Sequence, residues 1–217
     1  HNDGGLDMTV YPGQPSYPSG DNVRQPTRSP HEGVLVRRIG APQFRQTSLL
    51  RRLINWAAFT IWMTALLLVE RVERERKLVF VTCPPFLPVA MWAVCTIRRW
   101  EYTYIAYDLY PDEPVELGYV PKDGLVHRAW EALDRRALLG AEHVVALGPV
   151  MKERISAKGG PSFDAEKVSI IHNWEDEEFI TPMAKSDNWF SREHGLDEQF
   201  TVLYSGNIAE LPHLETP

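Results

Sequence analysis

The residues best placed to do chemistry are in the run Tyr107–Asp112 (YDLYPD), which follows the strand-like segment Tyr102–Tyr107. In open α/β sheets the ligand crevice lies outside the carboxyl ends of the strands, so Asp108 is positioned to touch a substrate. Its carboxylate could take a proton from an attacking hydroxyl group. The structural alternative is that Asp108 caps the next helix or anchors a turn through backbone N–H groups.

Two more strand-like segments end in residues of possible function. Thr82–Pro85 (TCPP) ends one of them, and Pro84 and Pro85 make a rigid turn that could form the floor of a crevice, although turn rigidity alone would also explain them. Tyr204–Asn207 (YSGN) ends another. A glycine at such a turn lets backbone N–H groups approach a phosphate, which is what a diphosphate ligand needs.

These residues are positioned by short strand-like runs that alternate with longer helix-like runs, which predicts an α/β protein with a mostly parallel sheet. Strands are predicted at Met8–Tyr11, Val34–Ile39, Leu78–Thr82, Tyr102–Tyr107, His143–Leu147, Lys167–Ile171 and Phe200–Ser205. Helices are predicted at Leu49–Lys77, Leu87–Arg99, Leu125–Leu139, Pro149–Ala157 and Lys185–His194. The Pro-, Gly- and Ser-rich stretch Pro12–Glu32 is predicted to be a long surface loop.

Composition narrows the function classes. The chain has 217 residues, 44% of them hydrophobic and 24% charged, as in an ordinary globular protein. Its net charge of -6 argues against a general nucleic-acid binder, which needs clustered cations. Cys83 and Cys95 have no CxxC spacing, and a reducing cytoplasm fits them best. The sequence has no GxGxxG after a strand, no P-loop and no HExxH, and its histidines lack the spacing of metal ligands.

The segment Ile54–Val69 is almost wholly apolar and has arginines on both sides. At 16 residues it is short for a membrane span, which needs about 20. It could be a helix buried against the sheet, or a helix at a membrane interface, with Trp56 and Trp62 among the headgroups and the arginines on anionic lipid. A true span is the third alternative.

Domain boundaries are expected near Asn173–Asn188, where Pro182 and several acidic residues interrupt the alternation. We expect a Rossmann-like domain over residues 1–180, a linker with a helix over 181–199, and the first strand of a second domain within 200–217. Because the chain does not begin with Met and ends just after a strand-like run, we expect it to be cut short at both ends.

Six motifs in order give a family resemblance: Gly13–Pro18 (GQPSYP), Thr82–Pro85 (TCPP), Asp108–Asp112 (DLYPD), Val145–Met151 (VALGPVM), Ile171–Trp174 (IHNW) and Tyr204–Asn207 (YSGN). Together they resemble the family-4 glycosyltransferases of the GT-B fold, particularly those of cell-surface polysaccharide synthesis. The resemblance implies an amino-terminal Rossmann-like domain that holds the acceptor and a second domain that holds a nucleotide-sugar donor. It implies no obligatory metal and no cofactor, since the nucleotide sugar is a substrate.

The resemblance also assigns roles to residues. Asp108 would be a base or an acceptor contact, and Gly206 and Asn207 would lie near the donor diphosphate. The substrate-binding residues it implies are Pro84, Pro85, Tyr110, Asp112 and Asn173. The acceptor would be a glycan or a lipid-linked sugar. The enzyme would be cytoplasmic and would meet a lipid-linked acceptor at the inner face of the membrane. Residues 54–69 could provide this peripheral association with the membrane.

The sequence departs from the family pattern at both ends. We expect the first strand–helix unit of the family to be absent, and Ala209 stands where the family continues with a glycine. We therefore expect that this chain by itself transfers no sugar. The alternatives are a non-catalytic remnant that binds a membrane or a partner, and an unstable pseudogene product.

Overall fold

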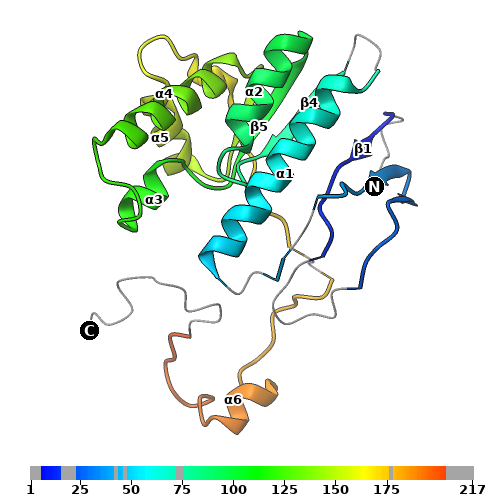
Figure 1. The fold of residues 1–217 in the computed structure, drawn as a ribbon. Coiled ribbons are helices and arrows are strands. Elements are labelled where there is room, and N and C mark those ends of the chain that lie inside the picture. The colour runs from blue at the N-terminus through cyan, green and yellow to red at the C-terminus, as the bar shows by residue number, and fades with distance from the viewer. Residues whose placement is uncertain are drawn as a thin grey trace. The chain divides into compact units, whose positions relative to one another are not determined.

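The computed structural model describes residues 6–15, 23–41, 44–45, 48–71, 76–175 and 178–203. The chain divides into two compact units, His1–Asn173 and Trp174–Pro217. In the second unit the described part contains one short helix, α6 (Trp189–Glu193), which Asn188 caps by accepting hydrogen bonds from the amides of Phe190 and Ser191. All other described helices and strands belong to the first unit (Figure 1).

The first unit is built on a parallel sheet of four strands that pair in chain order. These are β4 (Lys77–Val81), β5 (Glu101–Ala106), β6 (His143–Ala146) and β7 (Val168–Ile170). A three-stranded sheet has the order β1 (Thr9–Val10), β3 (Val34–Arg37) and β2 (Arg28–His31), with β1 parallel and β2 antiparallel to β3. The predicted α/β class and its parallel sheet are confirmed.

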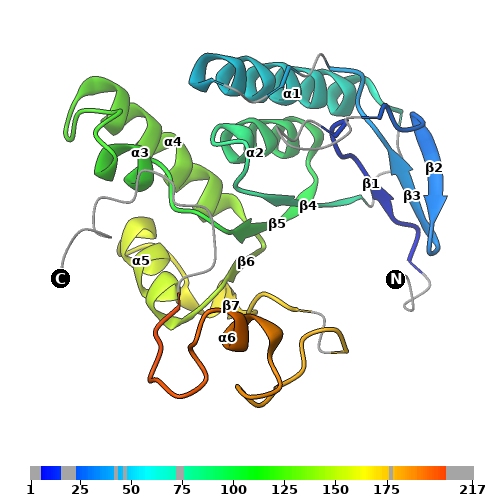
Figure 2. The same cartoon turned by 90° about the horizontal axis from the view of Figure 1, so that it is seen from below.

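Four long helices pack in a row in which each contacts the next: α1 (Leu49–Val69), α2 (Leu87–Arg98), α4 (Leu125–Gly140) and α5 (Pro149–Gly159). Two short helices, α3 (Asp112–Glu116) and the 3-10 helix Ala165–Lys167, complete the unit. Figure 2 shows α1 and α2 side by side over β4 and β5. Successive side chains of the strands point to opposite faces of the sheet. Phe80, Tyr104 and Val144 are buried on one face, whereas Val79 is exposed on the other.

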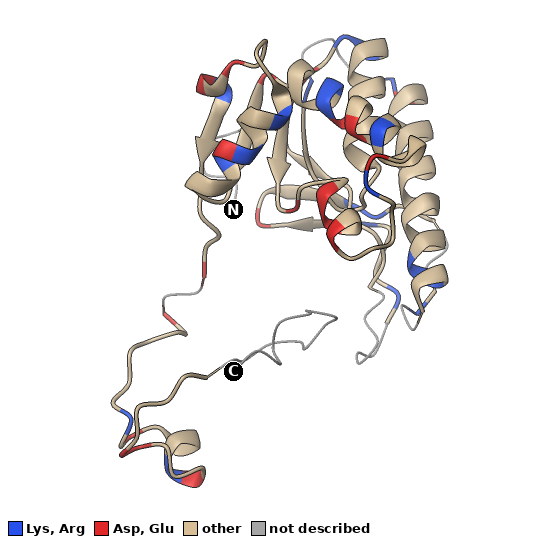
Figure 3. Ribbon diagram, turned by 90° about the vertical axis from the view of Figure 1, so that its left-hand side faces the viewer, with Lys and Arg blue, Asp and Glu red and all other residues tan. Residues whose placement is uncertain are grey.

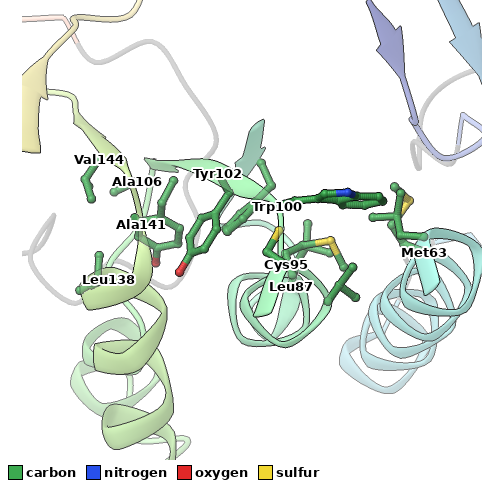
Figure 4. Packing of buried hydrophobic residues seen from close by; sticks show 14 of the residues in the cluster. Met63, Leu87, Cys95, Trp100, Tyr102, Ala106, Leu138, Ala141 and Val144 are labelled. Carbon is green, nitrogen blue, oxygen red and sulfur yellow. The ribbon is translucent and has the colours of Figure 1, made fainter. Parts of the chain in front are cut away.

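The core lies between this row of helices and the sheet. Tyr102 reaches from β5 toward the carboxyl end of α4, near Leu138 and Ala141 (Figure 4). Its hydroxyl group donates a hydrogen bond to the carbonyl oxygen of Ala137 at 2.6 Å. A Cβ atom on Gly140 would lie 2.6 Å from that hydroxyl oxygen. The small residue therefore allows α4 to approach β5 closely.

Helix α1 has polar interactions at both ends. Ser48 caps its first turn, and Asn55 holds the incoming chain through two hydrogen bonds to the backbone of Phe44, at 2.7 and 2.8 Å. At the other end Glu70 pairs with Arg37 and Arg76. The predicted helix Leu49–Lys77 is too long, because the backbone leaves the helical conformation and becomes extended at Glu70. The Glu70 carboxylate links the end of α1 to Arg37 of β3 and to Arg76, which precedes β4.

Two other predictions fail in the described residues. The predicted loop Pro12–Glu32 contains β2, because Arg28–His31 pair with β3 despite the prolines and glycines around them. The predicted strand Phe200–Ser205, which was to open a second domain, is not a strand over 200–203, where Phe200 and Val202 are exposed. A strand needs a neighbour for its backbone groups, and no described segment pairs with this one. Residues 204 and 205 lie outside the described residues.

Candidate active site

The carboxyl ends of β4 and β5 are tied together by one side chain. Thr82, just after β4, is fully buried, and its hydroxyl oxygen accepts hydrogen bonds from the backbone amides of Tyr107 and Asp108, both at 3.1 Å. The two amides would otherwise be unpaired at the point where the sheet ends. Thr82 therefore fixes the backbone from which the Asp108 side chain projects.

The Asp108 carboxylate is not used to cap a helix. Helix α3 begins after Pro111 without a hydrogen bond from a capping side chain, and no described residue donates a hydrogen bond to the Asp108 carboxylate. Burial raises the pKa of Asp108 above its ordinary value. A half-buried carboxylate that no described side chain holds in place, at the carboxyl edge of a parallel sheet, has the features of a functional residue.

Asp108 lines a cavity of about 470 Å³ between α3 and the amino end of α5. The other lining residues are Leu109, Asp112, Glu113, Glu116, Val150, Met151 and Arg154. Of these, Arg154 is the only cation, and its guanidinium group lies 3.4 Å from the Glu116 carboxylate. Carboxylates thus outnumber cations in the lining, so the cavity favours neutral hydroxyl-rich ligands over anionic phosphate groups.

One wall of the cavity is fixed by a buried ionic network. The Lys158 ammonium group, on α5, lies 3.1 Å from Asp112 on α3 and 3.8 Å from Asp134 on α4. Asp134 also accepts a hydrogen bond from the Tyr104 hydroxyl group at 3.2 Å. Burial raises the pKa of Asp134 to about 6, although Lys158 and Tyr104 act to lower it. Helices α3, α4 and α5 are therefore joined through Lys158.

This network predicts that Asp134→Asn stabilises the protein at neutral pH. Asp134 has a folded pKa of about 6 against an ordinary 3.8, so folding favours its protonated form, and this stabilisation is lost as pH rises through 6. Asn resembles the protonated acid, and Lys158 keeps its nearer partner, Asp112. We expect equal stabilities near pH 4 and an advantage for Asn of up to about 3 kcal/mol at pH 7.5.

Urea denaturation of both proteins between pH 4 and 7.5 measures this difference. The control is Glu153→Gln, which removes an exposed carboxylate from α5 and should give a difference near zero at every pH. If Asp134→Asn were less stable than the natural protein at pH 7.5, the attraction of Lys158 would outweigh the cost of burial.

The structure brings two of the sequence-predicted site residues, Asp108 and Asp112, into the same cavity. Pro84 and Pro85 are buried beneath the turn after β4 and do not line the cavity. Tyr110 is also buried, with its ring stacked on Trp130 at a centroid distance of 5.7 Å. Phe86 stacks on Trp130 as well, at 4.3 Å. Tyr110 thus holds the loop that carries Asp108 rather than lining the cavity.

Asn173 is exposed at the end of the first unit, next to His172, whose Nδ1 atom lies 2.8 Å from the carbonyl oxygen of Leu147. Asn173 does not line the cavity. Gly206 and Asn207 lie outside the described residues.

Sequence reasoning missed the contribution of α5 to the cavity, which consists of Val150, Met151 and Arg154. The available signal was Gly148-Pro149 shortly after β6, which places a helix amino end at the same sheet edge as Asp108. It also missed Glu113 and Glu116 because α3 itself was not predicted. In the part of the chain that the structure describes, no three His, Cys, Asp or Glu side chains are grouped as metal ligands.

Comparison with known proteins agrees with this geometry. A search of curated proteins gives no match to the chain. The family model described as "Glycosyl transferase 4-like domain" matches residues 3–174, which is most of the chain and nearly coincides with the first structural unit. A parallel α/β sheet with Asp108 at its carboxyl edge is the architecture that the resemblance implied. The chain therefore belongs to the glycosyl transferase 4-like family, and its first unit is a family-4 glycosyltransferase domain of the GT-B type.

Proposed function

We propose that the chain serves in the transfer of a sugar from a nucleotide-sugar donor to a hydroxyl group of a glycan or lipid-linked acceptor, in cell-surface polysaccharide synthesis. The observation that carries the proposal is the Asp108 carboxylate, half-buried in an acid-lined cavity at the carboxyl edge of a family-4 domain. In this proposal the acceptor occupies the cavity, and its reacting hydroxyl group meets Asp108.

The proposed chemistry is a substitution at the anomeric carbon of the donor. The acceptor oxygen forms a bond to that carbon, the bond from the carbon to the diphosphate breaks, and the nucleoside diphosphate leaves with the electron pair. Asp108 accepts the proton of the acceptor hydroxyl group. The burial that raises the pKa of Asp108 also makes its carboxylate a stronger base than an exposed aspartate.

The charge of the cavity supports its assignment to the acceptor. Hydroxyl groups donate hydrogen bonds that Glu113, Glu116 and Asp112 can accept, whereas a donor diphosphate would be repelled by the same carboxylates. In this proposal the diphosphate of the donor therefore binds outside the cavity, and the acceptor binds inside it. The proposal requires no metal and no cofactor for the acceptor to bind.

Calorimetric titration tests the proposal, with short oligosaccharides and polyprenyl-diphosphate sugars as acceptor probes and a panel of sugar nucleotides as donor probes. Glu113→Ala is expected to weaken acceptor binding about 10- to 100-fold, because a hydrogen bond to a charged group is lost. Its control, Glu131→Ala, removes another exposed carboxylate from α4, outside the cavity, and should leave the affinity unchanged.

The same titrations separate the enzyme from a non-catalytic binding protein. Binding of both probes with formation of a glycosidic product supports the transferase. Acceptor binding without donor binding or turnover favours the binding protein. Equal loss of acceptor affinity in Glu113→Ala and Glu131→Ala would show that the acceptor does not occupy the cavity.

A further inference from the structure

Helix α1 presents an apolar face away from the core. Its buried residues are Asn55, Met63 and Leu67, and these face the rest of the domain. The exposed positions follow helical spacing on the other side: Leu50, Ile54, Ala57, Ile61, Ala65 and Val69. Leu50 is 67% exposed, Ile61 69% and Val69 76%. A surface helix normally carries polar residues on such a face, so this face needs a covering partner.

The exposed face includes a groove that is apolar along its whole length. It measures about 510 Å³ and is lined by Ala58, Ile61, Trp62, Ala65, Leu66 and Val69. Trp62 is half exposed on one side of the groove and packs against Gly40 on the other. An amphipathic ring at the border between an apolar face and polar surroundings is characteristic of residues at a membrane interface.

Charge along α1 distinguishes among possible partners. The helix contains no acidic residue, and its cations, Arg51 and Arg52, are at the amino end (Figure 3). Arg45 is exposed next to this end, held there by the hydrogen bonds between Phe44 and Asn55. Arg51 stands about five helical turns before Val69 and is therefore on the same side of α1. Arg52 is on the opposite side, where its guanidinium group lies over the Trp56 ring at 5.2 Å. Cations beside an apolar face complement anionic lipid headgroups above hydrocarbon.

We propose that α1 lies flat on an anionic membrane, with Leu50, Ile61 and Val69 in the hydrocarbon boundary and Arg45 and Arg51 on the headgroups. Helix α1 has a mean hydropathy of 1.5 and is the one described helix long and apolar enough to cross a bilayer, by length and composition alone. Crossing would separate Met63 and Leu67 from the core and α1 from α2. A helix that lies in the membrane interface keeps both the core contacts of Met63 and Leu67 and the contact of α1 with α2.

Vesicle sedimentation without any sugar donor tests the docking independently of transferase activity. The natural protein should bind vesicles of phosphatidylcholine with phosphatidylglycerol more tightly than vesicles of phosphatidylcholine alone. Ile61→Glu should weaken binding at least about tenfold, because it places a charge in the apolar boundary. Leu125→Glu is the matched control, since Leu125 is 86% exposed on α4 and should be replaceable without loss of binding.

A second pair of variants leaves the apolar face intact. Replacing both Arg45 and Arg51 by Gln should weaken binding to anionic vesicles about fivefold for each arginine. Replacing Arg128 and Arg136, both exposed on α4, by Gln changes the net charge by the same amount and should have little effect on binding to anionic vesicles. Circular dichroism confirms that each variant is folded.

Three results would overturn the proposal. Equal binding to both kinds of vesicle would remove the role of the arginines. Equal losses in Ile61→Glu and Leu125→Glu would show that α1 is not the docking face. A natural protein that ignores vesicles but forms dimers in sedimentation velocity, with Ile61→Glu monomeric, would assign the face to a second copy of the chain.

Discussion

Replacing Asp108 by Asn is expected to lower the turnover of sugar transfer by about 10²–10⁴-fold, with little change in the KM for the acceptor. A general base acts only in the transition state, so its loss reduces kcat and kcat/KM together. Asn keeps the size and the hydrogen-bonding shape of the side chain but accepts no proton. Steady-state kinetics measures the effect in an enzyme that combines this domain with a donor-binding domain.

The pH profile gives an independent check on this prediction. Because burial raises the pKa of Asp108, activity should fall on the acidic side at a higher pH than an exposed aspartate would give. Asp112→Asn is the comparison, since Asp112 lines the same cavity but is engaged by Lys158, and it should preserve that acidic limb. A change confined to the acceptor KM in Asp108→Asn would make Asp108 a binding residue instead of a base.

Replacing Thr82 by Val is expected to destabilise the fold by up to about 6 kcal/mol, because two partly buried amides lose their acceptor at up to about 3 kcal/mol each. Valine has nearly the shape of threonine but no hydroxyl group, so it leaves the amides of Tyr107 and Asp108 unpaired. The same change releases the backbone that positions the Asp108 carboxylate. Any folded Thr82→Val protein should therefore also lose turnover.

Thr82→Ser is the matched control for this prediction. Serine keeps the oxygen that accepts both amides and removes one methyl group, which should cost about 1 kcal/mol. Urea denaturation and kinetic assays of the two variants separate the hydroxyl group from the methyl group. Equal destabilisation by Ser and Val would mean that the packing of the methyl group, and not the pair of hydrogen bonds, fixes this corner of the sheet.

Local sequence pattern was enough to predict the parallel sheet and the family. Alternating apolar runs placed β4 to β7 to within one or two residues, because a buried parallel strand must be apolar and short. The motif order gave the family, and the strand before Asp108 placed that residue at the carboxyl edge. These features depend on residues close together in the chain.

The interactions that depend on distant residues could not be predicted in this way. Thr82 and Asp108 are 26 positions apart, and only the pairing of β4 with β5 brings the hydroxyl group to the amide. Arg154 reaches the cavity because α5 lies beside α3, and Tyr110 stacks on Trp130 of α4, which is distant from it in the sequence. The sequence marked these residues as polar or aromatic but gave no direction for their side chains.

Helix α1 shows most clearly the difference between what the sequence predicts and what only the tertiary structure decides. Its sequence is apolar on nearly every side, so composition predicted a helix of unusual hydrophobicity without indicating which side faces the core. The tertiary structure decided this by burying Asn55, Met63 and Leu67 against the rest of the domain and leaving Ile61 and Val69 exposed. Periodicity reveals a buried face only where polar residues occupy the opposite face, and α1 has none there between Arg52 and Glu70.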